Sequence, residues 1–246
     1  MPDKKYCYPG SDVLINKLGI TNAKELFDAE VELTFMRLSE LSYAPIKGVF
    51  DFKHLKQIHK YIFQDVYAWA GKVRTVEIGK GNLFCLTAHI QDYADIIFKN
   101  YYPQCNMAKE DKEAFIKALA KNYGELNALH PFREGNGRAQ REFARLVCLD
   151  CGYNFNLAVA THEEMLAASQ LSFNKGDNVL FERIFSRAIS EITEETPYQN
   201  GVNVLTSDDL TLSPFDGYNY DEYNDDASLK KYRKAYNKKY KPYLKK

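Results

Sequence analysis

The sequence predicts an all-α, mainly helical fold with one short β-hairpin. Apolar residues recur at three- and four-residue spacing over most of residues 22–194, which is the pattern of helices with one buried face. Between residues 73 and 84 the pattern changes, because Val76 and Ile78 alternate with polar neighbours and a Gly-Lys-Gly-Asn turn follows. Alternation followed by such a turn is typical of a hairpin.

Two helices are expected before the hairpin. Asn22, with Glu25 three residues later, predicts the start of the first helix, and Asp51 predicts the start of the second. Gly71 is expected to end the second helix. The expected buried faces are Leu26, Ala29, Leu33, Met36 and Leu41 in the first helix, and Leu55, Ile58, Ile62, Phe63 and Val66 in the second.

Five helices are expected after the hairpin. Thr87 predicts the start of the first of them, which Pro103 is expected to end, and Thr161 predicts a capped start farther along. The expected helical segments are residues 87–101, 109–129, 138–151, 162–171 and 179 to about 194.

Length and composition suit one packed domain plus an extension. The chain has 246 residues, 45% of them hydrophobic, and we place the boundary between residues 1–195 and residues 196–246. The formal net charge is zero, so no overall field favours nucleic acid or a membrane surface as a partner. No stretch is apolar enough for a signal peptide or a membrane span, so we expect a cytoplasmic protein.

The last segment of the chain differs in character from the rest. Acidic residues gather within residues 208–226, and basic residues alternate with tyrosines within residues 230–246. We interpret residues 196–246 as a linker and a solvated, partly disordered tail whose two charge blocks offset each other. A basic arm for an acidic partner is the alternative.

One short segment holds an unusual concentration of reactive side chains, the run His-Pro-Phe-Arg-Glu-Gly-Asn-Gly-Arg at residues 130–138, closed by Arg141. Its two glycines permit a backbone nest that binds an anion, and the helix expected next adds its dipole. Glu134 is suited to hold Mg²⁺ between phosphates, and His130 to take a proton from an attacking hydroxyl. The segment therefore predicts a phosphate-handling active site.

Two simpler interpretations of this segment remain. The glycines and proline could build only a tight connection between helices, or the segment could belong to a helical module that binds a nucleotide or a partner without turnover. The first is disfavoured because every position carries a group that phosphoryl or nucleotidyl transfer requires. His130 argues against the second, because simple phosphate binding does not need a base.

The twelve residues from His130 to Arg141, His-Pro-Phe-Arg-Glu-Gly-Asn-Gly-Arg-Ala-Gln-Arg, resemble the signature of the Fic family. That signature is His-x-Phe-x-(Asp/Glu)-Gly-Asn-Gly-Arg-x-x-Arg, and every fixed position is matched. The resemblance to bacterial Fic toxins and effectors extends over roughly residues 8–194. Doc-type relatives, which phosphorylate their targets, resemble this chain less, because their motif lacks the Gly-Asn-Gly-Arg run and the final arginine.

The resemblance implies a protein adenylyltransferase that moves AMP from ATP to a Ser, Thr or Tyr hydroxyl of a target protein and releases pyrophosphate, as bacterial toxins do. It implies that His130 is the base and that Glu134 holds Mg²⁺. The phosphate-binding residues it implies are Gly135, Asn136, Gly137, Arg138 and Arg141. A secreted effector that acts inside a host cell, and transfer of another nucleotide or of a phosphate group, are the alternatives.

The hairpin also has a counterpart in Fic proteins, where it forms a flap over the active site and pairs with the target segment. An exposed strand edge can hold an extended peptide by main-chain hydrogen bonds and present its hydroxyl to the base. The target-docking residues implied here are Thr75, Val76, Glu77, Ile78 and Gly79. Because main-chain pairing reads little sequence, the flap does not reveal which protein is the target.

Targets and control are expected from the same resemblance. Similar toxins modify DNA gyrase and topoisomerase IV, so subunits of type II topoisomerases are the expected targets. Fic proteins are restrained by a helix that carries (Ser/Thr)-x-x-x-Glu-(Gly/Asn). Ser190 and Glu194 match the spacing, but Glu195 follows where Gly or Asn belongs. A separate small antitoxin that supplies the inhibitory helix is therefore the favoured arrangement.

Overall fold

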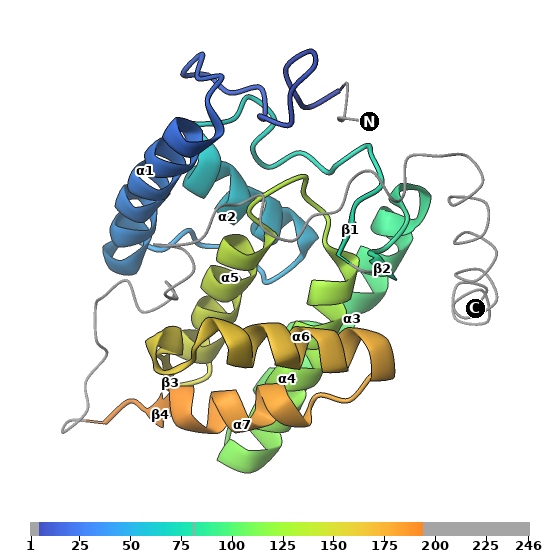
Figure 1. Ribbon diagram of the computed structural model, residues 1–246. Coiled ribbons are helices and arrows are strands. Elements are labelled where there is room, and N and C mark those ends of the chain that lie inside the picture. The colour runs from blue at the N-terminus through green and yellow to red at the C-terminus, as the bar shows by residue number, and fades with distance from the viewer. Residues whose placement is uncertain (1–4, 81, 194–246) are drawn as a thin grey trace.

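The computed structural model describes residues 5–80 and 82–193, and over these residues it confirms the predicted helical fold with a small hairpin (Figure 1). The α-helices are α1 (Ala23–Tyr43), α2 (Phe52–Phe63), α3 (Ile90–Met107), α4 (Lys112–Leu129), α5 (Asn136–Asp150), α6 (His162–Lys175) and α7 (Val179–Ala188). The strands are β1 (Gly79–Lys80), β2 (Asn82–Leu83), β3 (Tyr153–Phe155) and β4 (Ile189–Glu191), and two 3₁₀ turns are η1 (Thr87–His89) and η2 (Leu157–Val159).

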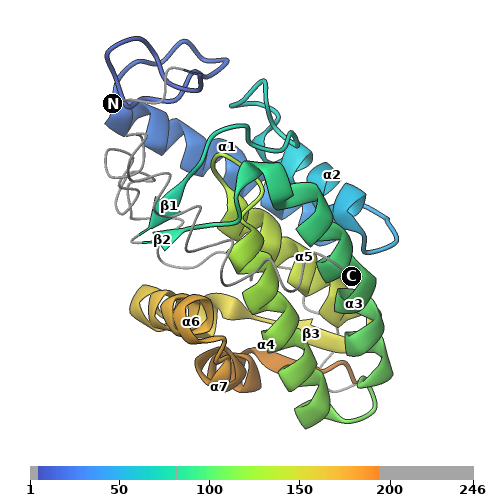
Figure 2. The ribbon, with the colours of Figure 1, turned by 90° about the vertical axis from the view of Figure 1, so that its right-hand side faces the viewer.

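Helix α5 is the centre of the fold. Nearly all of its side chains are buried, including charged ones, and α2, α4 and β3 pack against it. Helix α3 packs along α4, while α6 and α7 lie side by side across the lower part of the molecule (Figures 1 and 2). In Figure 1 the loop between α4 and α5 lies above both helices, between α1 and the β1–β2 hairpin.

The helix starts predicted at Asn22, Asp51 and Thr161 are confirmed, and a side chain caps each of them. The carboxamide of Asn22 accepts a hydrogen bond from the backbone of Glu25, and Asp51 accepts one from the backbone of His54. Thr161 and Glu164 form a reciprocal capping box at the start of α6. These starts were predictable because a cap needs only residues that are neighbours in the sequence.

The buried face of α1 differs from the prediction. Met36 was expected inside but is 53% exposed, whereas Glu30 and Thr34 lie on the buried face. That face follows a four-residue spacing from Leu26 to Leu38. Its two polar positions are buried because they pair with a charged side chain on α5, described below.

Two predicted helix ends are wrong. Helix α2 ends at Phe63, and Gly71 instead occupies a later turn, where its backbone has a φ of 78° and its N–H donates to His59 Nδ1 at 2.8 Å. Helix α3 continues through Pro103 to Met107. Proline removes one backbone donor, but the helix continues because Tyr101 and Cys105, on either side of it, are both fully buried.

The last predicted helix is also too long. Helix α7 ends at Ala188, and the chain then forms β4, which pairs antiparallel with β3 with Phe155 opposite Ile189. Ser190 therefore lies in a strand, and Glu194 lies outside the described residues, as does the tail. This sheet was not predictable, because three-residue strands are too short to show alternation and they pair distant segments of the chain.

The predicted hairpin exists but is smaller than expected. Its strands pair antiparallel with Gly79 opposite Leu83, so residues 75–78 precede the first strand rather than forming it.

Within the described part of the chain, no helix combines the length and apolar character needed to cross a membrane.

Candidate active site

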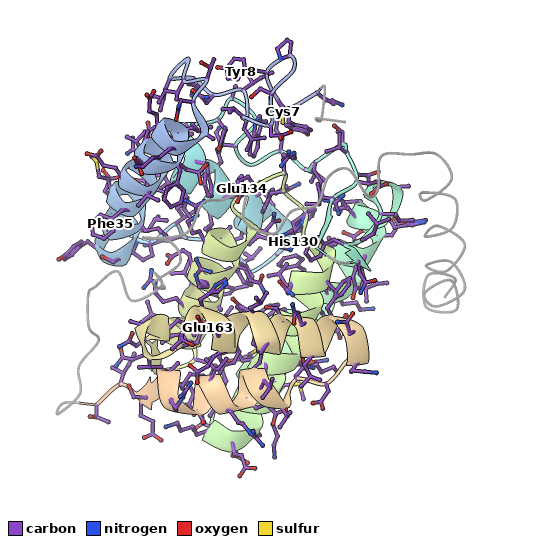
Figure 3. The ribbon with its side chains drawn as sticks, viewed as in Figure 1. Cys7, Tyr8, Phe35, His130, Glu134 and Glu163 are labelled. Carbon is purple, nitrogen blue, oxygen red and sulfur yellow. The ribbon has the colours of Figure 1, made fainter. Side chains whose placement is uncertain are left out.

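The loop between α4 and α5, residues 130–135, is buried rather than exposed. His130 and Glu134 are each 8% exposed, and Figure 3 shows them on opposite sides of this loop, near the end of α4 and the start of α5. Phe132 is fully buried, and its ring stacks on that of His59 with 3.8 Å between the centroids. Phe132 therefore anchors the loop in the core.

His130 terminates α4 in the left-handed conformation, with a φ of 44°. Its Nδ1 lies 3.1 Å from the carbonyl oxygen of Asn127. A carbonyl only accepts hydrogen bonds, so Nδ1 carries the proton of the neutral ring and Nε2 carries the lone pair. The ring of Phe84 stacks on the imidazole at 3.7 Å and fixes its plane. The arrangement leaves Nε2 as the basic atom of an oriented imidazole.

The side chain of Asn136 holds the loop closed. Its oxygen accepts from the Phe132 N–H and its nitrogen donates to the Phe132 carbonyl, both at 2.8 Å. Because this reciprocal pair satisfies the peptide groups of a buried turn, the Asn136 carboxamide is engaged within the protein.

His59 supports the same loop from α2. Its Nε2 donates to the carbonyl of Glu134 at 2.9 Å, and its Nδ1 accepts from Gly71. The bond that Nδ1 accepts requires the neutral ring, and burial lowers the pKa of His59 to about 3. The sequence offered no ligand role for this residue, and the structure gives it a structural one.

Both motif glycines lie against side chains, and only Gly135 combines this contact with a positive φ. Gly135 has a φ of 77°, and a side chain there would overlap the ring of Phe63. A Cβ on Gly137 would lie 2.9 Å from Nη1 of Arg141, which packs against the first turn of α5. The glycines therefore let one aromatic ring and one guanidinium approach the backbone of the motif.

The start of α5 presents backbone donors. The N–H of Gly135 is taken by Glu134 Oε1 at 2.7 Å, and the first intrahelical bond runs from Ala139 to the carbonyl of Gly135 at 3.2 Å. The N–H groups of residues 136–138 thus precede the first helical bond, at the positive end of the helix dipole. Such an end is an anion-binding site.

Glu134 is a buried carboxylate in an unfavourable setting. Burial, together with the neighbouring Glu30 carboxylate, raises the pKa of Glu134 to about 7, although the positive charge of Arg138 opposes this rise. A cation beside Glu134 would relieve the cost. One carboxylate suits an ion that substrate phosphates also hold, as is common for Mg²⁺. No group of three or more potential metal ligands occurs among the described residues.

Arg138 is held by α1. Its Nη2 donates to Glu30 and its Nη1 donates to the Thr34 hydroxyl at 2.9 Å, while its guanidinium carbon lies 4.6 Å from the Phe63 ring centroid. Tyr67 donates to the other oxygen of Glu30. Both Nη nitrogens of this guanidinium therefore donate hydrogen bonds to protein groups.

The structure brings the predicted motif residues together. His130 and Glu134 lie in the loop, the phosphate-binding candidates from Gly135 to Arg138 lie in the loop and the first turn of α5, and Arg141 lies one turn farther. Ser190, the candidate inhibitory residue, is an exposed residue of β4.

The predicted flap residues have partners of their own. The Thr75 hydroxyl is hydrogen-bonded to the Tyr6 hydroxyl, with 3.2 Å between the oxygens. The Glu77 carboxylate accepts hydrogen bonds from the backbone N–H and the hydroxyl of Thr87. Ile78 is buried, and Gly79 begins β1.

Sequence reasoning missed Glu30, Thr34 and Tyr67. Glu30 and Thr34 had one signal, which is their four-residue spacing between Leu26 and Leu38 on a helix. Polar residues in an apolar stripe indicate a buried partner, but the sequence does not show where that partner lies.

A glycine-rich turn here joins an oriented histidine to a helix N-terminus, which places a base in the same loop as an anion-binding helix end. The chain belongs to the Fic/DOC family, whose family model matches residues 49–148. It is 34% identical over 191 residues to the probable protein adenylyltransferase Fic of Escherichia coli K12, covering 77% of this chain and 94% of that protein.

Two further relatives come from Bartonella. The chain is 36% identical over 220 residues to the protein adenylyltransferase VbhT of Bartonella schoenbuchensis, covering 87% of this chain but 46% of VbhT, so it spans less than half of that relative. The N-terminal Fic domain of a VirB-translocated Bep effector protein from Bartonella quintana, solved with bound ADP, superposes with a TM-score of 0.71. That domain is 25% identical, and the match covers 76% of this chain and 94% of the domain.

We expect Glu30→Ala to lower the free energy of unfolding by about 3 kcal/mol, because it leaves the Arg138 guanidinium buried without its carboxylate. Glu30→Gln should cost less, since an amide oxygen still accepts. Urea denaturation measures both, with Glu32→Ala, an exposed site on the same helix, as the control. Equal effects at positions 30 and 32 would contradict the ion pair.

We expect ionisation of Glu134 to lower the free energy of unfolding of the metal-free protein as the pH rises. The unfolded carboxyl ionises near its ordinary pKa of 4.5, whereas the folded one ionises near 7. The folded state therefore loses stability between these two values, by about 3 kcal/mol from this group. Glu134→Gln removes this loss, so the variant should gain on the wild type between pH 5 and pH 8 in urea titrations. Parallel pH profiles would show that Glu134 ionises normally.

Proposed function

We propose that this protein is a protein adenylyltransferase that transfers AMP from ATP to a hydroxyl of a target protein. The observation that carries the proposal is one loop that holds an oriented His130 imidazole beside the N–H groups that begin α5. The names of the relatives in Escherichia coli and Bartonella schoenbuchensis support the activity, and the ADP in the Bartonella quintana domain supports a nucleotide substrate.

In the proposed reaction, Nε2 of His130 removes the proton of the target hydroxyl while the hydroxyl oxygen attacks the α-phosphorus of ATP. A phosphorus–oxygen bond forms to the target, and the bond between the α-phosphorus and the bridging oxygen breaks. Pyrophosphate leaves with that electron pair. The products are the AMP-modified protein and pyrophosphate, and the histidine later returns its proton to solvent.

The phosphates are proposed to lie against the start of α5. The backbone N–H groups of residues 136–138 would stabilise the charge on the phosphates, and the Arg141 side chain would bind the outer ones. Arg138 is proposed to contribute mainly its positive charge rather than direct phosphate hydrogen bonds, because its guanidinium already donates to Glu30 and Thr34. Glu134 is proposed to hold Mg²⁺, which when bound would supply positive charge for the leaving pyrophosphate.

The target segment is proposed to pair with the outer edge of β1. Strand β2 occupies the other edge of β1 and is fastened to α6, where Asn82 donates to Asn174 at 2.8 Å and Phe84 meets Phe173 edge to face. Strand addition at β1 would then present a Ser, Thr or Tyr hydroxyl toward His130.

The choice of targets and the mode of control are finer proposals. We propose intracellular protein targets, with type II topoisomerase subunits as the first to test, and a separate small antitoxin as the inhibitor. The strand at Ser190 supports an external inhibitor, because this segment is not helical as an inhibitory helix requires. The proposed compartment is the bacterial cytoplasm. Delivery into a host cell is the alternative, since one relative is named a translocated effector.

We expect transfer of label from [α-³²P]ATP, but not from [γ-³²P]ATP, to proteins of a bacterial lysate. His130→Ala should reduce the rate by about a hundred- to ten-thousand-fold, since it removes only the base. His162→Ala, at the start of α6, is the matched control and should label at the wild-type rate. Label from the γ-phosphate would indicate phosphorylation, and full activity of His130→Ala would reject the mechanism.

We expect expression in Escherichia coli to arrest growth in a manner that depends on His130, because the proposed targets are bacterial. Colony counts after induction, with the His130→Ala variant as control, measure this effect. Harmless expression together with labelling of a eukaryotic lysate would favour the effector alternative.

A further inference from the structure

Arg74 is one of the largest fully buried side chains of the protein, at 2% exposure, and neither the motif nor the proposed chemistry uses it. It lies between Gly71 and β1, at the base of the hairpin. A buried guanidinium requires acceptors for its donors, so its partners show what it holds in place.

Those partners belong to the catalytic loop and to both ends of the hairpin. Nε donates to the carbonyl of His130 at 2.8 Å, Nη1 donates to the carbonyl of Val76 at 2.8 Å, and Nη2 donates to the carbonyl of Cys85. The backbone N–H of Arg74 adds a bond to the Pro131 carbonyl at 2.9 Å. One rigid, planar group thus joins the chain before β1, the chain after β2 and the histidine itself.

The bond to the His130 carbonyl matters because it restrains the backbone of the histidine itself. His130 has a positive φ of 44°, which is unfavourable for a residue with a side chain and persists only where its surroundings fix it. The bond from Arg74 restrains the peptide that follows this strained residue, while Asn127 and Phe84 restrain its ring. The direction of the imidazole therefore depends on the base of the hairpin.

The hairpin end is restrained in the same way. Glu77 lies 3.4 Å from Nη1 of Arg74 and accepts from the backbone and hydroxyl of Thr87, and the N–H of Cys85 donates to Ala128 on α4 at 3.0 Å. Arg74 and Glu77 together set where β1 begins relative to the loop.

We infer that Arg74 is a positioning residue that sets the edge of β1 and the His130 imidazole at a fixed separation, so that a hydroxyl on a paired target segment meets the base. This inference rests on the proposed function, and it concerns the approach of the target rather than the binding of ATP. Lysine cannot replace arginine here, because one ammonium on a flexible stem cannot reach three carbonyls in fixed directions.

The test compares Arg74→Lys with Arg145→Lys. Arg145 is a similarly buried arginine on α5, and it pairs with Glu142 on α5 and with the carbonyl of Leu41 on α1 rather than with the hairpin. The same substitution at both sites separates a general loss of stability from a loss of positioning. Both variants are assayed well below their melting temperatures, at which circular dichroism shows them folded.

Hydrogen exchange is the first measurement, because it needs no turnover. In Arg74→Lys the amides of Phe84, Cys85 and His130 should exchange at least about tenfold faster, since the groups that hold the hairpin base are lost. The same amides in Arg145→Lys should exchange at the wild-type rate. Unchanged exchange in Arg74→Lys would overturn the inference, whatever the enzyme is found to transfer.

Kinetics is the second measurement, with auto-modification by [α-³²P]ATP as the probe. Arg74→Lys should lower kcat by about tenfold or more and leave the KM for ATP within about twofold, because the start of α5 is untouched. Arg145→Lys should keep both values. A rise in the KM for ATP with unchanged kcat would overturn the positioning role. Absence of label transfer by the wild type would refute the proposed function alone, since the exchange result stands by itself.

Discussion

The site depends on the need of a buried turn for hydrogen-bond partners. The loop at residues 130–135 has no regular secondary structure, yet it is buried, so its peptide groups must find partners elsewhere. Arg74 takes the carbonyls of residues 130 and 131, Asn136 takes both peptide groups of residue 132, and His59 takes the carbonyl of residue 134. The family match at residues 49–148 includes all three of these side chains. The motif is therefore one part of a larger unit that comprises α2, the hairpin base and α5.

A second constraint is the charge buried beneath this loop. Glu30 and Glu134 both lie near Arg138, so two carboxylates share one guanidinium in a largely buried region. The desolvation penalty of such a cluster offsets much of its electrostatic gain, so it adds little to stability. It does fix side-chain directions, and it suits a site that receives a cation with its substrate. Glu30 and Thr34 come from α1, which precedes the family match. The candidate site therefore depends on α1, a helix outside the residues that the family model matches.

Structure that depends on neighbouring residues was predicted well from the sequence, whereas structure that depends on contacts between distant segments was not. The helix starts at Asn22, Asp51 and Thr161 were predictable because caps are made by sequence neighbours. Helix ends were not, because tertiary packing decides whether α3 continues past Pro103. The motif was found for the same reason as the caps, since its residues are contiguous. Its supports Glu30 and Arg74 were missed, because a buried polar residue is recognised only when its distant partner is known.

The structure also changes how the motif should be interpreted. A motif assigns each polar side chain to the substrate, but the carboxamide of Asn136 bonds the turn and the guanidinium of Arg138 bonds α1. The proposed phosphate contacts therefore fall mainly to backbone N–H groups and to Arg141. Backbone donors at a helix start cannot reorient, so their favourable field is in place before the reaction begins. Donors that grip only phosphates carry no information about the base, so any preference for adenine must come from residues outside the motif.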